Sequence, residues 1–336
     1  MFSMAMAVAV GFLMISTSAQ AQDNLAAAEK FYKGARVTIE AGPAGSGVDI
    51  GARLFAKYFE QSTGARVIVQ NHSEVGGLKA INLTYRAKPD GLTIGCHTLS
   101  TVIQNQLLGE PAAMYELDKL IPIGSSLMAP MALWVNPDGA YGDLEKLRAS
   151  KGLLQAGASK LGYMAFWGTL GGHLIGLDFK TVIGVGGPPA AKMSVMRGET
   201  HFTNIAVHTT GIAPDLRPVL FISLERHDLH PEVPTIHEVA DLTAEQEDLL
   251  ALAEIGGLYS GAGFVFPPGV APDRMKYVQN VYRQITTSQE FIEESKKLFG
   301  VSGAHDAEKL TENIQFYIDN RDKLEEIRQL VTGYYL

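Results

Sequence analysis

The chain has 336 residues, of which 46% are apolar and 19% are charged. Length and composition indicate a globular protein of about two domains and exclude a disordered chain. The formal net charge of −8 argues against a nucleic-acid partner, because neutralising phosphates requires a basic face. Cys96 is the sole cysteine, which excludes an intrachain disulfide and a cysteine-ligated zinc site.

The first 21 residues are typical of an export signal. Met4 to Thr17 is apolar and uncharged, and Ala19 to Ala21 matches a small-residue cleavage site. We therefore predict a signal peptide over 1–21, cleaved near Ala21, and a periplasmic protein. Residues 1–21 contain no Lys or Arg, which departs from a complete signal peptide. A membrane anchor is the alternative, although about 14 apolar residues are too few to span a bilayer.

Strands and helices alternate in the first part of the mature chain. Apolar and β-branched runs predict strands over 36–41, 66–70 and 92–97. Helical periodicity begins at Asp49 and ends at Gly64, and a second helix covers about 77–87. This order favours a parallel sheet with helices on both faces.

The middle of the chain repeats this order, and the last third is mainly helical. Short strands are predicted over 120–123, 131–135, 153–156, 181–184, 201–207 and 219–223, with helices over 144–148 and 191–197. Further helices begin at Pro272, cover 290–298, and run from Ala307 to about Leu330. We infer two α/β domains: a discontinuous first domain over 22–124 and 225–336, and a second over 125–224.

The segment from Gly42 to Asp49 carries the sharpest functional signal. It links a strand to a helix through three glycines, so backbone N–H groups and the helix dipole can hold an anion. A dinucleotide loop is one alternative, but the spacing from Gly45 is one residue too long, and Gln70-Asn71 stands where an acidic ribose ligand is expected. A purely structural turn is the other.

Two more glycine turns follow strands in the middle of the chain, at 157–162 and 185–190. In the first, Ser159 and Lys160 would hold a carboxylate beside the helix start, and Tyr163 would face the cleft. The same turn is a near match to a hydrolase nucleophile elbow. As a nucleophile, Ser159 would need His173 or His208 as its base, and nothing local orients either ring.

Histidines and acidic residues gather at His227, His230, His237 and Glu238. Their spacing differs from a zinc-protease motif, and Pro231 and Pro234 lie among them. We interpret the segment as a solvated loop rather than a metal site, and we predict neither a metal nor a cofactor.

Several segments, in chain order, resemble the periplasmic solute-binding proteins of tripartite tricarboxylate transporters. The matching segments are 43–49, 71–77, 89–91, 157–162, 183–187, 198–199, 231–238 and 266–272. The resemblance implies a two-domain periplasmic-binding-protein-like α/β fold with a ligand cleft between the domains. It further implies a monomer without enzymatic activity that closes on a small organic carboxylate, through a hinge near 122–130 and 218–226, and delivers it to membrane subunits.

The glycine turns and the resemblance together define the candidate ligand-binding set: Pro43, Ala44, Gly45, Ser46, Gly47, Asp49, Asn71, Gly76, Gly77, Thr98, Ser159, Lys160, Gly162, Tyr163, Val185, Gly186, Gly187 and Asn204. Ser46 replaces a loop glycine of the family, and Val185 to Gly187 replaces its Tyr-x-Gly element. The identity of the ligand therefore does not follow. A secreted serine hydrolase using Ser159 and a ligand-sensing receptor module are the alternative functions.

Overall fold

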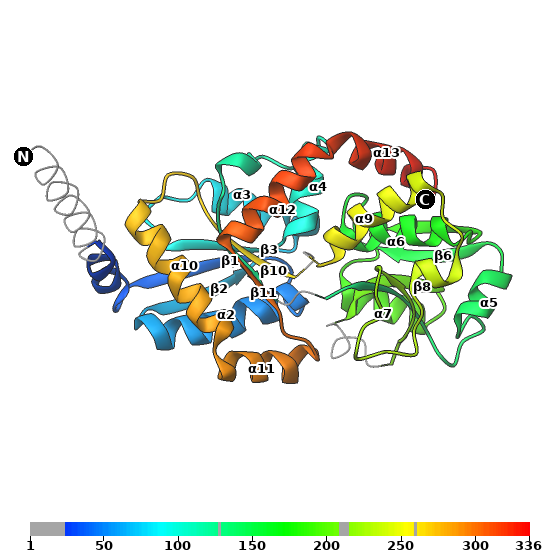
Figure 1. The fold of residues 1–336 in the computed structure, drawn as a ribbon, viewed down its shortest axis with the longest axis horizontal. Helices are drawn as coiled ribbons and strands as arrows, with labels where there is room; N and C mark the ends of the chain where they lie inside the picture. The colour runs from blue at the N-terminus through cyan, green and yellow to red at the C-terminus, as the bar shows by residue number, and fades with distance from the viewer. Residues whose placement is uncertain (1–23, 127–128, 208–214, 259–260) are drawn as a thin grey trace, which may run out of the picture.

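The computed structural model describes residues 24–126, 129–207, 215–258 and 261–336. Figure 1 shows two lobes side by side, each built around one sheet. None of the helices in these ranges is long and apolar enough to cross a membrane. The two-domain α/β fold expected from the sequence is confirmed.

The first lobe is organised by a six-stranded mixed sheet of order β11-β4-β10-β3-β1-β2. β1 pairs in parallel with β2 and β3, as predicted, whereas β10 runs antiparallel between β3 and β4. Its strands are β1 (Arg36–Ala41), β2 (Arg66–Asn71), β3 (Thr93–Thr98), β4 (Ile121–Ser126), β10 (Ala262–Phe266) and β11 (Ala304–Asp306).

The second lobe holds a five-stranded sheet of order β7-β6-β8-β5-β9. β6 pairs in parallel with β7 and β8, and β5 runs antiparallel between β8 and β9. Its strands are β5 (Met131–Val135), β6 (Leu153–Gly157), β7 (Phe179–Ile183), β8 (Phe202–Ala206) and β9 (Arg217–Ile222).

Helices cover both faces of each sheet (Figure 1). The first lobe carries α2 (Gly47–Thr63), η1 (Glu74–Gly77), α3 (Leu78–Tyr85), α4 (Leu99–Leu107), η2 (Leu117–Lys119), α10 (Pro272–Thr287), α11 (Gln289–Phe299) and α12 (Ala307–Asp319). The second carries α5 (Leu144–Ala149), α6 (Tyr163–Leu174), α7 (Pro188–Met196), α8 (Ile236–Val239), α9 (Ala244–Leu258) and α13 (Arg321–Thr332).

The structure differs from the predicted domain boundaries after residue 224. We assigned 225–336 to the first domain, but α8, α9 and α13 pack on the second lobe. The chain therefore crosses between lobes after β4, again between α9 and β10, and a third time between α12 and α13. The first crossing lies within 122–130, one of the two segments where we expect a hinge, whereas β9, in the other segment, pairs with β5 inside the second sheet.

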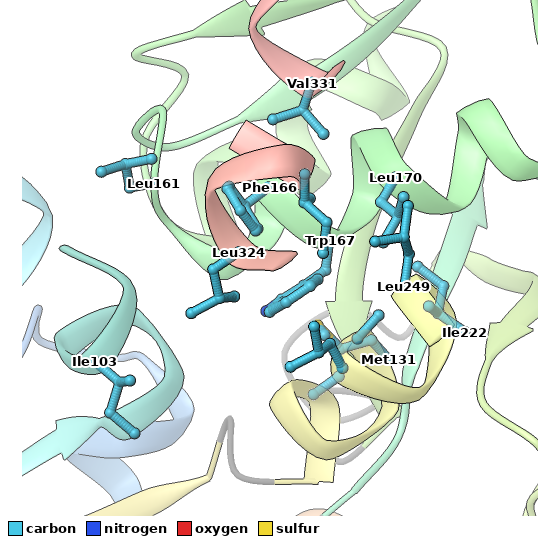
Figure 2. Close-up of a cluster of buried hydrophobic side chains, with 14 of the residues drawn as sticks. Ile103, Met131, Leu161, Phe166, Trp167, Leu170, Ile222, Leu249, Leu324 and Val331 are labelled. Carbon is cyan, nitrogen blue, oxygen red and sulfur yellow. The ribbon is translucent and has the colours of Figure 1, made fainter. Parts of the chain in front are cut away.

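The predicted helix from Ala307 to Leu330 is two helices, α12 and α13, separated at Asn320. The apolar residues predicted for one helix therefore pack on both lobes. Leu310 lies in α12, which packs on β4, and Leu324 and Ile327 lie in α13, which packs on α6. Figure 2 shows the resulting core, in which Trp167 lies among side chains of the second lobe, with Ile103 of α4 at the side of the first lobe.

Candidate functional site

The turn after β1 positions the start of α2. The backbone N–H and Oγ of Ser46 both donate to Pro43 O, at 3.2 and 2.6 Å. Gly45 adopts φ +73°, a conformation that the turn requires and glycine allows. Ser46 Oγ also accepts from Asp49 N at 3.3 Å and so caps the helix. The N–H groups of Gly47 and Val48 have no partner among the described residues, at the positive end of the helix dipole.

The carboxylate of Asp49 stabilises this turn through hydrogen bonds and is not available to a ligand. Its carboxylate is nearly buried and accepts from Gly45 N at 2.8 Å and from Asn71 Nδ2 at 2.9 Å. Arg53 Nε pairs with it at 2.9 Å, one helical turn away. Its partners thus come from the loop, from the end of β2 and from α2, and it does not line the cavity described below.

Replacing Asp49 with alanine is expected to lower the free energy of unfolding by roughly 2 kcal/mol, because the part-buried donors of Gly45 and Asn71 lose a charged acceptor. The matched control is Arg53→Ala, which removes a half-exposed partner and should cost under about 1 kcal/mol. Urea unfolding measures both. Equal, small losses would show that Asp49 does not organise the loop.

The second glycine segment lies against the first. Asn71 Nδ2 also donates to Gly42 O at 2.9 Å, which joins the ends of β1 and β2. Gly77 adopts φ +93° at the start of α3, and a Cβ there would lie 3.5 Å from Pro43 Cδ. Asn71 is thus a positioning residue that holds the two loops in contact.

In the second lobe, the chain passes from β6 into α6 through a tight turn. Gly162 N donates to Ser159 O at 3.1 Å, and a Cβ at Gly162 would come within 2.6 Å of Ser159 Oγ. Tyr163 N donates across the lobes to Thr101 Oγ1 at 3.4 Å. Asn204 Nδ2 donates to Tyr163 O at 3.1 Å, so Asn204 supports the helix start from β8.

The turn from β7 into α7 lies beside the turn after β6. Gly184 N and Val185 N donate to Ala158 O and Gly157 O at 3.2 and 3.1 Å. Gly186 adopts φ +101°. Helix α7 then begins with two prolines, Pro188 and Pro189, which have no N–H to offer a ligand.

These segments surround one cavity of about 460 Å³ between the lobes. Of the candidate residues, those that line it are Pro43, Ala44, Ser46, Gly47, Gly77, Thr98, Ser159, Gly162, Tyr163, Gly186 and Gly187. Those that do not are Gly45, Asp49, Asn71, Lys160, Val185 and Asn204, whereas the placement of Gly76 relative to the cavity is not described. Most of the second group belong to these loops or are hydrogen-bonded to them, so they position the residues that line the cavity.

Sequence reasoning missed several lining residues: Gly42, Val48, Ser73, Leu78, His97, Thr101, Val102, Ala158, Met164, Gly184, Pro188, Pro189 and Ala190. His97 and Thr101 were detectable in principle, because β3 ends beside β1 and ligands bind at the carboxyl ends of parallel strands. Helix α4, which carries Thr101 and Val102, was not predicted, although Thr98, its N-cap residue, is of a type common at helix starts.

The cavity wall carries little charge. Burial, followed by the nearby His72 ring, lowers the pKa of His97 to about 3, so this imidazole is neutral at physiological pH. Its Nε2 has no partner among the described residues. None of the lining residues is Lys or Arg, so the polar groups of the wall are backbone N–H groups and hydroxyl-bearing side chains, namely Ser46, Ser73, Thr98, Thr101, Ser159 and Tyr163.

The hydrolase alternative gains no geometric support. His173 Nδ1 is hydrogen-bonded to Tyr334 OH at 2.8 Å instead of to Ser159. His208, the other proposed base, lies outside the described residues.

The histidines and acidic residues between His227 and Glu238 do not form a metal site. Glu238 instead pairs with Arg226. The described parts of the chain contain no group of three or more His, Cys, Asp or Glu suited to a metal ion.

No family model matches the chain. A UPF0065 protein from the tcbD–tcbE intergenic region of Pseudomonas sp. strain P51 is 28% identical over 208 residues, which are 60% of this chain and 61% of that protein. Protein BugT of Bordetella pertussis is 30% identical over 108 residues, 32% of this chain and 33% of BugT. The chain thus matches less than two thirds of the length of each of these relatives.

Solved structures match over more of the chain. The periplasmic binding protein BugD has a TM-score of 0.71 at 18% identity, with 91% of this chain and all of BugD covered. An adipate-bound Rhodopseudomonas palustris protein has a TM-score of 0.70 at 18% identity, covering 88% of this chain and 97% of its own. Malate-bound MatC of the same organism has 0.67 at 18% identity, covering 88% and 99%. The fold is that of these periplasmic binding proteins, as the resemblance seen in the sequence implied.

Proposed function

We propose that the chain is an exported solute-binding receptor of the tripartite tricarboxylate transporter type. It captures a small organic carboxylate between its lobes and delivers it to membrane subunits. It acts as a monomer in the periplasm after removal of residues 1–21, and it catalyses no reaction.

One observation carries the proposal: a cavity bounded on both sides by glycine turns that open helices. The N–H groups of Gly47 and Val48, which have no partner among the described residues, form the positive end of the α2 dipole, where a carboxylate is favoured. Thr98 and Thr101 add hydroxyl groups from the neighbouring strand end and helix. The malate and adipate in the similar structures belong to the same chemical class.

One contact between the lobes supports closure of the cavity around a ligand. Thr101 and Tyr163 lie on different lobes and are hydrogen-bonded to each other. A ligand that touches both walls adds contacts available only when the lobes are together, and so shifts the population to the closed form.

Thermal unfolding of the chain from Gln22 onward, with and without ligands, tests the proposal. A carboxylate at 100 times its dissociation constant should stabilise the protein by about 2.7 kcal/mol and raise the midpoint by several degrees. The neutral amide of the same acid is the control and should have little effect. If a nucleotide or a peptide raised the midpoint and no mono-, di- or aromatic carboxylate did, the proposal would be wrong.

A further inference from the structure

We propose that Tyr335 is a positioning residue for ligand binding. Its hydroxyl holds the turn at 159–162 in the conformation that receives the ligand, although Tyr335 itself does not line the cavity. This inference rests on the proposed function and adds a residue to its site. It predicts that the affinity for a carboxylate depends on a side chain 175 residues further along the chain than the carbonyl group it holds.

The 159–162 turn carries polar groups that the second lobe presents to the cavity. Ser159 and Gly162 line the cavity, as does Met164 in the first turn of α6. The N–H groups of Ser159 and Met164 have no acceptor among the described residues. Free N–H groups at a helix start favour an anion or another acceptor group of a ligand. The conformation of this turn therefore decides where these donors point.

Tyr335 holds the turn through a carbonyl group in its middle. Within the turn, Gly162 N donates to Ser159 O at 3.1 Å, and the carbonyl of Lys160 takes no part in that bond. Tyr335 OH donates to Lys160 O at 2.7 Å, and no other described residue donates to this oxygen. Burial raises the pKa of the Tyr335 phenol, so the hydroxyl keeps its proton and acts as the donor.

The backbone on both sides of Tyr335 is fixed to the second sheet. Thr181 of the edge strand β7 donates through its N–H to Tyr334 O at 2.8 Å, and Leu336 N donates to Thr181 O at 2.9 Å. The ring of Tyr334 stacks on that of Phe179, with 4.6 Å between the ring centroids. The Tyr335 hydroxyl therefore extends from a backbone that is paired with the sheet.

The hydrogen bond from Tyr335 lies within the second lobe, unlike the contact that joins the lobes. Tyr163 N, at the start of α6, donates to Thr101 Oγ1 of the first lobe, so this bond is lost when the lobes separate. The bond from Tyr335 to Lys160 does not depend on the first lobe. Tyr335 thus keeps the turn ordered before the ligand arrives, and binding to a preorganised turn costs less conformational entropy.

The variant Tyr335→Phe tests this role, because it removes the hydroxyl and keeps the ring. Calorimetry with the carboxylate that best stabilises the protein against heat should give a dissociation constant roughly 3- to 10-fold higher, the effect of one lost hydrogen bond. Tyr334→Phe is the matched control. It makes the same change at the neighbouring residue, whose hydroxyl is bonded to His173 Nδ1 at the other end of α6, and should leave the affinity unchanged.

Amide hydrogen exchange without ligand gives a readout that a general loss of stability would not produce. The amide of Gly162, which donates to Ser159 O, should exchange faster in Tyr335→Phe than in the unmodified protein. The amide of Val185, which donates to Gly157 O in the neighbouring turn, should exchange at the same rate in both proteins.

Three results would overturn the inference and leave the proposed function standing. They are an unchanged affinity in Tyr335→Phe, an equal loss of affinity in both tyrosine variants, and an unchanged exchange rate at Gly162. Failure of the unmodified protein to bind any carboxylate would overturn the proposed function and, with it, the role of Tyr335.

Discussion

Replacing Gly47 with proline is expected to weaken carboxylate binding by roughly 10- to 100-fold, the effect of losing one hydrogen bond to a charged group. Gly47 is the first residue of α2, and its N–H has no partner among the described residues. Proline is favoured at this helix position, and its ring removes the donor alone. The preceding Ser46 has the extended backbone that proline requires, with φ −77° and ψ 162°.

The control for this variant is Gly47→Ala, which adds a Cβ but keeps the N–H. Its dissociation constant should stay within a few-fold of the unmodified protein, and circular dichroism should show the same helix content for all three chains. If alanine and proline weakened binding equally, the loss would come from volume and not from the missing donor. Calorimetry with the best acid found by thermal unfolding provides the measurement.

Stability is expected to fall as the pH drops from about 6.5 towards 3, with a large contribution from His97. Its pKa is lowered from 6.5 to about 3 in the folded protein, chiefly by burial. Between these values the unfolded chain binds a proton that the folded chain does not, so unfolding becomes more favourable as the pH falls. At pH 4, His97 alone should remove about 3 kcal/mol of the stability present at pH 7.

The variant His97→Gln isolates this contribution. Burial also lowers the pKa of other histidines, namely His173, His201, His227 and His305, and their effects are common to both proteins. The difference between the two unfolding free energies should therefore change by up to about 1.4 kcal/mol per pH unit between pH 6.5 and 3. Urea unfolding without ligand at several pH values measures it, and parallel curves would contradict a neutral, buried His97.

The strands were predictable because their sequences alternate or are uniformly apolar. The ranges predicted for β1 and β5 match the structure, and most others differ by one or two residues at an end. β10 and β11 were missed. Ala262 to Phe266 is a short run beside Gly261, and Ala304 to Asp306 contains a histidine and an aspartate, which a strand pattern does not favour. Both pair only with strands distant in the sequence.

The candidate site was predictable where chemistry and local geometry coincide. Glycine turns at helix starts led to the segments around Ser46, Ser159 and Gly186, and these line the cavity. Side-chain direction was not accessible from sequence. Asp49 seemed a ligand residue because of its place in the loop, yet it turns back to Gly45 N. Lys160 seemed a cation for the ligand, yet it does not reach the cavity wall.

The strand order of the first lobe has a consequence for how the chain folds. β3 and β4 are joined only through β10, which begins at Ala262, and β11 completes the sheet after that. A growing chain that ends before β10 leaves both strands with open edges and cannot finish this lobe. Such long-range pairing slows folding, because a large loop must close before the contacts form. The first lobe should thus remain incomplete until β10 and β11 have been made, although all five strands of the second sheet precede them in the chain.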